Sequence, residues 1–153
     1  MLIAVIRRGG TMKTMRMTAL ASLLSIFSST ATQADTLTIE MLTKPSRMYS
    51  IELARISVGN TVKWLPSAKG HNVHIRNGPD GVKVPKKSKT SKKFSMTFET
   101  PGVYFYWCTP HKGMGMLGLI VVGDDLSNLD DIAQSKTKGQ SSKKLSELIA
   151  QLR

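Results

Sequence analysis

Hydrophobic and polar positions alternate in short runs across residues 36–122, and Gly, Pro, Asn or Asp clusters separate the runs. Runs of about four to eight residues bounded by such clusters are typical of β-strands. The runs that we expect to form strands are Thr36–Leu42, Met48–Ile56, Thr61–Leu65, His71–Ile75, Phe94–Phe98, Val103–Cys108 and Leu117–Val122. Several strands at this spacing predict a mostly β domain, an antiparallel sandwich or barrel.

The apolar spacing becomes helical after residue 123. The apolar positions with this spacing are Leu126, Leu129 and Ile132 in the first segment, and Leu145, Leu148, Ile149 and Leu152 in the second. Apolar residues three or four positions apart lie on one face of a helix. We therefore expect two short helices that pack against the sandwich rather than a second domain.

The N-terminal segment has the pattern of a secretory signal peptide. Four basic residues precede the apolar run Thr18–Phe27, and small residues follow it up to Ala34. This run is too short to cross a bilayer, which takes about 20 apolar residues. We expect residues 1–34 to be a cleaved signal peptide, with the start at Met1 or Met12; a membrane anchor or a buried helix is the alternative. After cleavage the protein would be periplasmic and would not insert into the membrane.

The remaining chain, residues 35–153, is basic. It contains 18 of the 22 Lys and Arg residues and all ten Asp and Glu residues, a net charge of +8. Such a surface attracts acidic proteins or nucleic acid. Nucleic acid is disfavoured, because the segment before this domain directs secretion and no stacking aromatic residues are interleaved with the lysines.

The only cysteine, Cys108, begins the segment CTPHKGMGM, which also contains His111, Met114 and Met116. A redox dithiol and a C-x-x-C-H haem attachment both need a second cysteine. A structural zinc site usually takes four Cys or His ligands, and methionine is a poor zinc ligand. A cysteine nucleophile with His111 as its base would lack an evident carboxylate or amide to orient the histidine.

A blue-copper electron-transfer site fits all of these residues. Its ligands are a thiolate and two imidazoles, with a weak axial thioether. The soft sulfur ligands favour Cu(I), and the imidazoles also suit Cu(II), so both oxidation states can share one ligand set. Cys108, His111 and a methionine supply three ligands, and the fourth must be an upstream histidine.

The segment HNVHI offers two such histidines, His71 and His74. On a strand, His71 would share a face with Val73 and Ile75, while Asn72 and His74 would point the other way. Val73 and Ile75 are typical core residues. Strand alternation therefore favours His71 as the buried ligand and His74 as an exposed strand residue.

The segments KGHNV and GVYFYWCTPHKGMGMLGLIVVGD closely resemble those of the pseudoazurins, within the cupredoxins. The likeness extends from TIEML to the two helical stretches. It implies one domain over residues 35–153, an eight-stranded Greek-key cupredoxin sandwich with two short C-terminal α-helices. It also implies one type 1 copper ion bound by His71, Cys108, His111 and Met116.

The resemblance assigns roles around these ligands. Met114 is the alternative axial ligand, since some cupredoxins have a shorter His-to-Met loop, but the pseudoazurin pattern places the ligand at Met116. Asn72 would brace the ligand loop through Thr109 and lie near the cysteine sulfur, where such hydrogen bonds tune a metal site. Trp107 departs from the family pattern, in which a lysine often precedes the cysteine.

The lysines suggest how a partner docks. Lys69 and Lys112 adjoin the two ligand histidines in sequence, and Lys44 falls where similar proteins carry a lysine near the copper face. A basic rim around an apolar patch steers an acidic partner and speeds the encounter. The further lysines between Lys83 and Lys93 suit either docking or a solvated surface equally.

The sequence thus indicates a periplasmic electron carrier rather than an enzyme. Similar proteins pass electrons to or from nitrite reductases, nitrous oxide reductase and amine-oxidising systems, so we expect an acidic redox partner and a monomeric carrier. The alternatives are a periplasmic copper storage or delivery protein and a cysteine-dependent enzyme.

Overall fold

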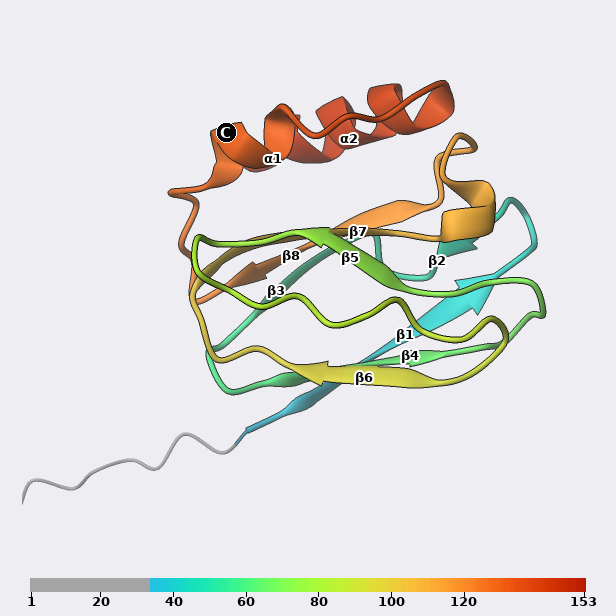
Figure 1. The fold of residues 1–153 in the computed structure, drawn as a ribbon, viewed down its shortest axis with the longest axis horizontal. Coiled ribbons are helices and arrows are strands. Elements are labelled where there is room, and N and C mark those ends of the chain that lie inside the picture. Colours follow the sequence, from blue (N-terminus) through green and yellow to red (C-terminus); the bar gives the residue numbers. More distant parts are fainter. Residues whose placement is uncertain (1–33) are drawn as a thin grey trace, which may run out of the picture. The chain divides into compact units, whose positions relative to one another are not determined.

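A computed structural model describes residues 34–153, so the expected signal peptide lies outside the described residues apart from Ala34. The strands are β1 (Thr36–Leu42), β2 (Met48–Tyr49), β3 (Leu53–Ile56), β4 (Thr61–Leu65), β5 (His74–Asn77), β6 (Phe94–Thr97), β7 (Gly102–Trp107) and β8 (Leu117–Val122). They form two four-stranded sheets in the orders β2-β1-β4-β6 and β3-β8-β7-β5 (Figure 1).

The two sheets enclose the main core, and strand alternation decides which side chains enter it. Ile39 of β1 and Trp64 of β4 point inward from the first sheet, and Tyr104 and Tyr106 of β7 point inward from the second. All four are at most 1% exposed. Gly118 makes room here, because a Cβ at this position would lie 2.5 Å from the Tyr106 hydroxyl oxygen.

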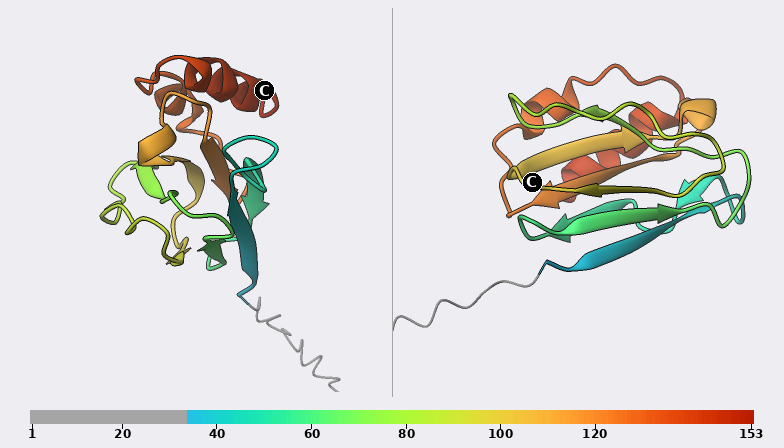
Figure 2. Two further views of the ribbon diagram at one scale, coloured as in Figure 1. Left: turned by 90° about the vertical axis from the view of Figure 1, so that its right-hand side faces the viewer. Right: turned by 60° about the horizontal axis from the view of Figure 1, so that its bottom comes forward.

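The two helices, α1 (Leu129–Ala133) and α2 (Gln140–Ala150), cover the outer face of the second sheet (Figure 1, Figure 2). The alternate residues of β7 and β8 therefore face a second apolar cluster instead of water. Its members are Val103, Phe105, Leu117, Leu119, Val121, Leu129, Ile132, Leu145, Leu148, Ile149 and Leu152. Burial on both faces explains why β8 is an uninterrupted apolar run.

The predicted mostly β sandwich of eight strands with two C-terminal helices is confirmed. The expectation of wholly antiparallel pairing is wrong, because β1 pairs with β4 and β3 pairs with β8 in parallel. No described helix is both long enough and apolar enough to cross a membrane.

The expected single strand Met48–Ile56 is two strands that belong to different sheets. β2 pairs with β1, while β3 pairs with β8. Between them the Ser50 amide donates to the Glu40 carbonyl of the first sheet, and the Glu52 carbonyl accepts from the Leu119 amide of the second. The chain therefore crosses between the sheets at residues 50–52.

The expected strand His71–Ile75 begins only at His74, so the alternation argument for His71 rests on a wrong premise. Residues 71–73 hydrogen-bond to the loop that follows β5: the Ser91 amide donates to the His71 carbonyl, and the Ser88 amide donates to the Val73 carbonyl. His71, Asn72 and Val73 are consequently all buried, at 1%, 3% and 0% exposure.

Candidate metal centre

The turn between β7 and β8 sets Cys108 and His111 side by side. A short 3-10 helix spans Thr109–His111, and the His111 amide donates to the Cys108 carbonyl at 3.0 Å. The Cys108 amide donates to the Met116 carbonyl at 2.9 Å, which closes the loop. Pro110 fits the first turn of this helix because it has no amide hydrogen to be satisfied.

His71 lies in a different segment of the chain, and its ring approaches Cys108 and His111. It lies between β4 and β5, and the Gly70 amide before it donates to the Ser91 hydroxyl at 2.9 Å. The Thr43 hydroxyl, in the loop after β1, lies 2.9 Å from Nε2 of His71. These contacts direct Nδ1 of the ring toward Cys108 and His111.

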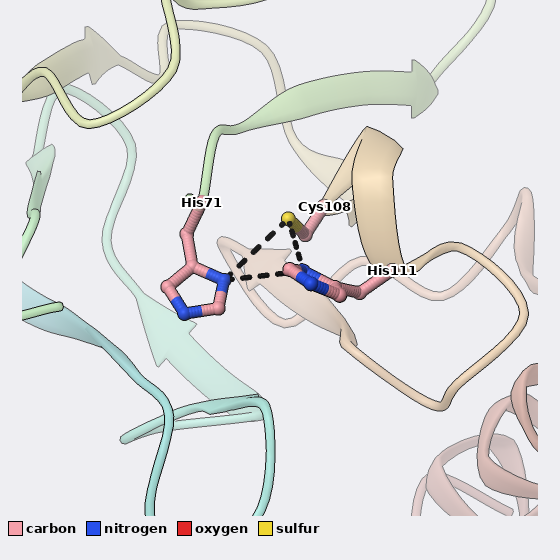
Figure 3. Close-up of side chains that lie close together, drawn as sticks. All are labelled: His71, Cys108 and His111. Atoms are coloured by element: carbon pink, nitrogen blue, oxygen red, sulfur yellow. Dashed lines mark hydrogen bonds between the residues drawn. The ribbon is translucent and has the colours of Figure 1, made fainter. Parts of the chain in front are cut away.

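The three side chains converge on one point (Figure 3). Nδ1 of His71 lies 3.2 Å from Nδ1 of His111, and the Cys108 Sγ lies 3.9 Å and 3.3 Å from those two nitrogens. They form the one group of three or more His, Cys, Asp or Glu residues within residues 34–153 that could hold a metal ion.

This donor set suits copper. Two ligands of one ion are separated by distances of this size when their bonds are about 2.0 to 2.3 Å long, as in zinc sites with nitrogen and sulfur ligands. A thiolate with two imidazoles is also the set that blue-copper sites use. No carboxylate belongs to the group, which disfavours the hard cations that prefer oxygen ligands.

The two candidate axial methionines differ sharply in burial. Met116 is 0% exposed and packs in the same core cluster as Cys108, whereas the Met114 side chain is 47% exposed. A thioether held in the core beside the thiol can approach an ion bound there. Met114 instead lines a surface hollow of about 400 Å³ with Arg47 and Lys143 among its walls.

The histidine rings of the cluster are neutral and the thiol is protonated, so no positive charge on these side chains opposes the binding of a cation. Burial raises the pKa of the Cys108 thiol, so the thiol keeps its proton until a metal ion displaces it. Burial lowers the pKa of both His71 and His111, and the positive charge of Arg47 lowers each of them further. Both rings are therefore neutral, with a nitrogen lone pair available, at pH values where an ordinary histidine is partly charged.

Asn72 and Thr109 lie directly behind the cysteine. The Thr109 amide donates to Oδ1 of Asn72 at 2.8 Å, and Nδ2 of Asn72 lies 3.5 Å from the Thr109 hydroxyl. This pair ties the segment before β5 to the turn after β7, so it fixes the distance between His71 and Cys108. His74 is half-buried rather than fully exposed, and its Nδ1 lies 3.5 Å from the same hydroxyl.

Three exposed lysines, Lys44, Lys69 and Lys112, were expected at the docking face, and all three side chains reach solvent. The sequence did not indicate that Thr43 and Arg47 act on the ligand histidines: Thr43 contacts His71, and the charge of Arg47 lowers the pKa of His71 and His111. Both belong to the loop between β1 and β2, which no motif links to the histidines, so only the folded chain reveals their proximity.

Comparison with known proteins agrees with this geometry. Residues 40–123 match the model of a family described as copper binding proteins, plastocyanin/azurin family. A putative pseudoazurin of Rhizobium leguminosarum bv. viciae is 38% identical over 119 residues, 74% of this chain and 78% of that protein. The chain belongs to the pseudoazurins, within the plastocyanin/azurin family.

Further relatives support this assignment. The pseudoazurin of Methylorubrum extorquens is 36% identical over 124 residues, which cover 78% of this chain and 83% of that protein. A crystal structure of pseudoazurin from Methylobacterium extorquens AM1 superposes with a TM-score of 0.72 at 33% identity, over 78% of this chain and 100% of that one. The predictions of copper as the cofactor and of an electron-transfer protein rather than an enzyme are confirmed by this membership.

Proposed function

We propose that residues 35–153 form a periplasmic type 1 blue-copper electron carrier, released by removal of residues 1–34. The convergence of the Cys108 thiol with two imidazole nitrogens within 3.9 Å carries the proposal. When bound, copper supplies a one-electron couple between Cu(I) and Cu(II). His71, Cys108 and His111 would hold it in a plane, and Met116 would supply the weak axial ligand.

The protein framework would keep these ligands in place in both oxidation states. Cys108 and Met116 are held by the core and by their backbone hydrogen bond, and His71 is held by Thr43 and by the loop containing Ser91. A site that does not rearrange between its two states gives and takes an electron at low cost. Of the two ligand rings, His71 is 1% exposed whereas His111 is partly exposed, so His111 offers the shorter path between the site and a partner.

A potentiometric titration of the copper-loaded protein tests this role. An electron carrier should show reversible one-electron oxidation and reduction and keep its copper throughout repeated cycles. The alternative, a copper storage or delivery protein, predicts that the metal passes to a chelator or an acceptor upon reduction. Loss of stoichiometric copper during cycling would therefore contradict the carrier function.

The partner would be an acidic oxidoreductase, such as a nitrite reductase, that meets a monomeric carrier. Lys44, Lys69 and Lys112 are exposed around the site and would steer the encounter. We expect the association rate to fall as salt rises, because exposed charges are screened within about 10 Å at about 0.1 M salt.

Charge reversal should mimic salt. Lys112→Glu should lower the association rate with an acidic reductase by up to about tenfold at low salt, because steering of this kind is worth about 10-fold or more. Lys83→Glu, in the connection after β5, is the matched control and should change the rate less. Stopped-flow kinetics measure both; a rate that is independent of salt and of Lys112 would rule out electrostatic steering.

A further inference from the structure

A hollow of about 350 Å³ lies beside the metal centre and outside its ligand set. The residues that line it include Asn72, Lys87, Lys89, Thr90 and Thr109. We call it the Lys87 hollow. Its volume is at the lower end of the range of small-molecule pockets, which is about 300–1,000 Å³, so it is large enough for a small ligand.

The Lys87 hollow is positively charged, with no acidic side chain among the described residues that line it. Lys87 and Lys89 are both exposed, and neither takes part in the four ion pairs found within residues 34–153. Burial lowers the pKa of His74 nearby, and the charges of Arg76 and Lys87 lower it further. The complementary ligand of such a hollow is an anion.

Asn72 brings a buried hydrogen-bond donor to the hollow, since it is 3% exposed. Its Oδ1 accepts the Thr109 amide hydrogen at 2.8 Å, which fixes the orientation of the carboxamide. Its Nδ2 lies 3.4 Å from the Ser88 carbonyl oxygen and 3.5 Å from the Thr109 hydroxyl. Both contacts are longer than the usual hydrogen bond of about 2.7–3.2 Å, so Nδ2 can still donate to a ligand.

The segment that carries both lysines is anchored to the chain before β5. The Ser88 amide donates to the Val73 carbonyl at 2.8 Å, and the Ser88 hydroxyl accepts from the Val73 amide at 2.9 Å. Three positions later the Ser91 amide donates to the His71 carbonyl at 2.8 Å. This wall of the hollow is therefore held in place before a ligand binds, which lowers the entropic cost of binding.

The arrangement of donors favours a tetrahedral oxyanion over a carboxylate. The two ammonium groups and the Thr90 hydroxyl come from one segment of the chain, the Asn72 amide from a second and the Thr109 hydroxyl from a third. The oxygens of a phosphate group point in different directions, so they can accept from several walls at once. The two oxygens of a carboxylate lie in one plane and suit a planar donor such as arginine.

We infer that the Lys87 hollow is a phosphate-binding site, for free phosphate or for the phosphate group of an ester, and that the bound anion stabilises the oxidised copper centre. The second part rests on the proposed function, because it needs a copper ion beside Cys108. The anion would lie against Asn72 and Thr109, directly behind the cysteine. Its negative charge would favour Cu(II) over Cu(I), so phosphate would lower the reduction potential.

Binding can be measured by NMR on the reduced, copper-loaded protein, titrated with inorganic phosphate. We expect shifts at the amides of Lys89, Thr90 and Thr109 and at the side-chain amide of Asn72. The side-chain amide of Asn128, at the opposite end of β7, is an internal control. Sodium acetate at the same ionic strength should cause much smaller shifts. Equal shifts with both anions would mean that the lysines attract any anion and would overturn the proposal.

The double variant Lys87→Gln/Lys89→Gln should weaken phosphate binding by about tenfold, because it removes two charged donors. The matched control is Lys83→Gln/Lys92→Gln, which changes the charge of the same loop equally at two lysines that do not line the hollow. Thr90→Val removes a hydroxyl without changing the net charge and should weaken binding by about 2- to 10-fold. Equal affinities in the two double variants, or an unchanged affinity in Thr90→Val, would overturn the proposal.

Two further probes identify the source of the phosphate group. Glycerol 3-phosphate that causes the same shifts as inorganic phosphate would assign a soluble ester. Phosphatidylglycerol vesicles that sediment with the wild type, but not with Lys87→Gln/Lys89→Gln, would assign a lipid headgroup. Binding of inorganic phosphate alone would assign the free ion, and no binding of any of the three would overturn the proposal.

Voltammetry tests the link to copper. Phosphate should lower the reduction potential of the wild type more than acetate does at the same ionic strength, and Lys87→Gln/Lys89→Gln should remove this difference. Phosphate that binds without changing the potential would overturn the second part of the inference. An unchanged copper absorption band in the variants separates failure of this inference from failure of the proposed function.

Discussion

Asn72 shows how one polar side chain can hold two distant segments together. It is 3% exposed, and its Oδ1 accepts the Thr109 amide hydrogen from across 37 positions of sequence. The bond joins the segment before β5 to the turn after β7, where Cys108 and His111 lie. That Asn72 braces the turn through Thr109 stays a prediction, which this contact supports.

Replacing Asn72 by alanine should destabilise the metal-free protein by about 1–3 kcal/mol, the usual cost of leaving a buried donor unsatisfied. Chemical denaturation of the metal-free protein measures the change. Asn60→Ala is the control, since Asn60 accepts from the Asp35 amide at an exposed position and should contribute less. Similar losses for the two variants would mean that the Asn72–Thr109 bond does not stabilise the turn.

Replacing Met116 or Met114 by glutamine shows which of the two is the axial ligand. Met116→Gln should lower the reduction potential of the copper-loaded protein, because an oxygen ligand is harder than a thioether and favours Cu(II). It should also destabilise the metal-free protein by about 1–3 kcal/mol, since the amide replaces a fully buried side chain. Met114→Gln should do neither. If voltammetry showed that Met114→Gln lowers the potential more than Met116→Gln, Met114 would instead be the axial ligand, as in the shorter His-to-Met loop.

At the scale of the element, the loop between β1 and β2 forms one wall of the site. Its Thr43 hydroxyl contacts His71, and, in addition to burial, the positive charge of its Arg47 lowers the pKa of both ligand histidines. Lys44, between them, was chosen from the family pattern for partner docking. Arg47 gives this loop a different role, because its positive charge lowers the pKa of His71 and His111.

Neutralising Arg47 should therefore change the titration of the site. In the metal-free Arg47→Gln variant the pKa of His71 and of His111 should both rise, because a cation that opposes their protonation is removed. Protons would then compete with copper at a higher pH. NMR of the two rings follows the titration, with Lys44→Gln as the control. If Lys44→Gln raised the two pKa values as much as Arg47→Gln, the effect would come from net charge and not from the position of Arg47.

The sequence predicted most elements well where their burial pattern is simple. β1 and β4 have the predicted bounds, and each alternates between exposed and buried positions. The crossing at residues 50–52 and the irregular backbone at residues 71–73 could not be predicted, because their hydrogen-bond partners lie in distant segments. His71 was chosen for its strand position, yet it is buried because the loop containing Ser88 and Ser91 covers it.

At the scale of the whole molecule, the sandwich is a rigid scaffold with the candidate site at one edge. Two apolar clusters, one between the sheets and one under the helices, anchor β7 and β8, the two strands that flank the ligand turn. Neither cluster needs a metal ion to form. We therefore expect the fold to be stable without copper, so that the ligands can be replaced without unfolding the protein.

The absorption spectrum of the copper-loaded protein is the most direct test of a type 1 copper site. We expect an intense visible charge-transfer band from the Cys108 thiolate to copper, which Cys108→Ser abolishes while the circular dichroism of the sandwich is retained. Ser141→Ala, at the start of α2, is a control outside the ligand set that should keep the band, although it removes the hydroxyl that accepts from the Gly115 amide next to Met116. A wild-type protein without the band, or an intensely blue Cys108→Ser variant, would contradict the assignment of a type 1 copper site.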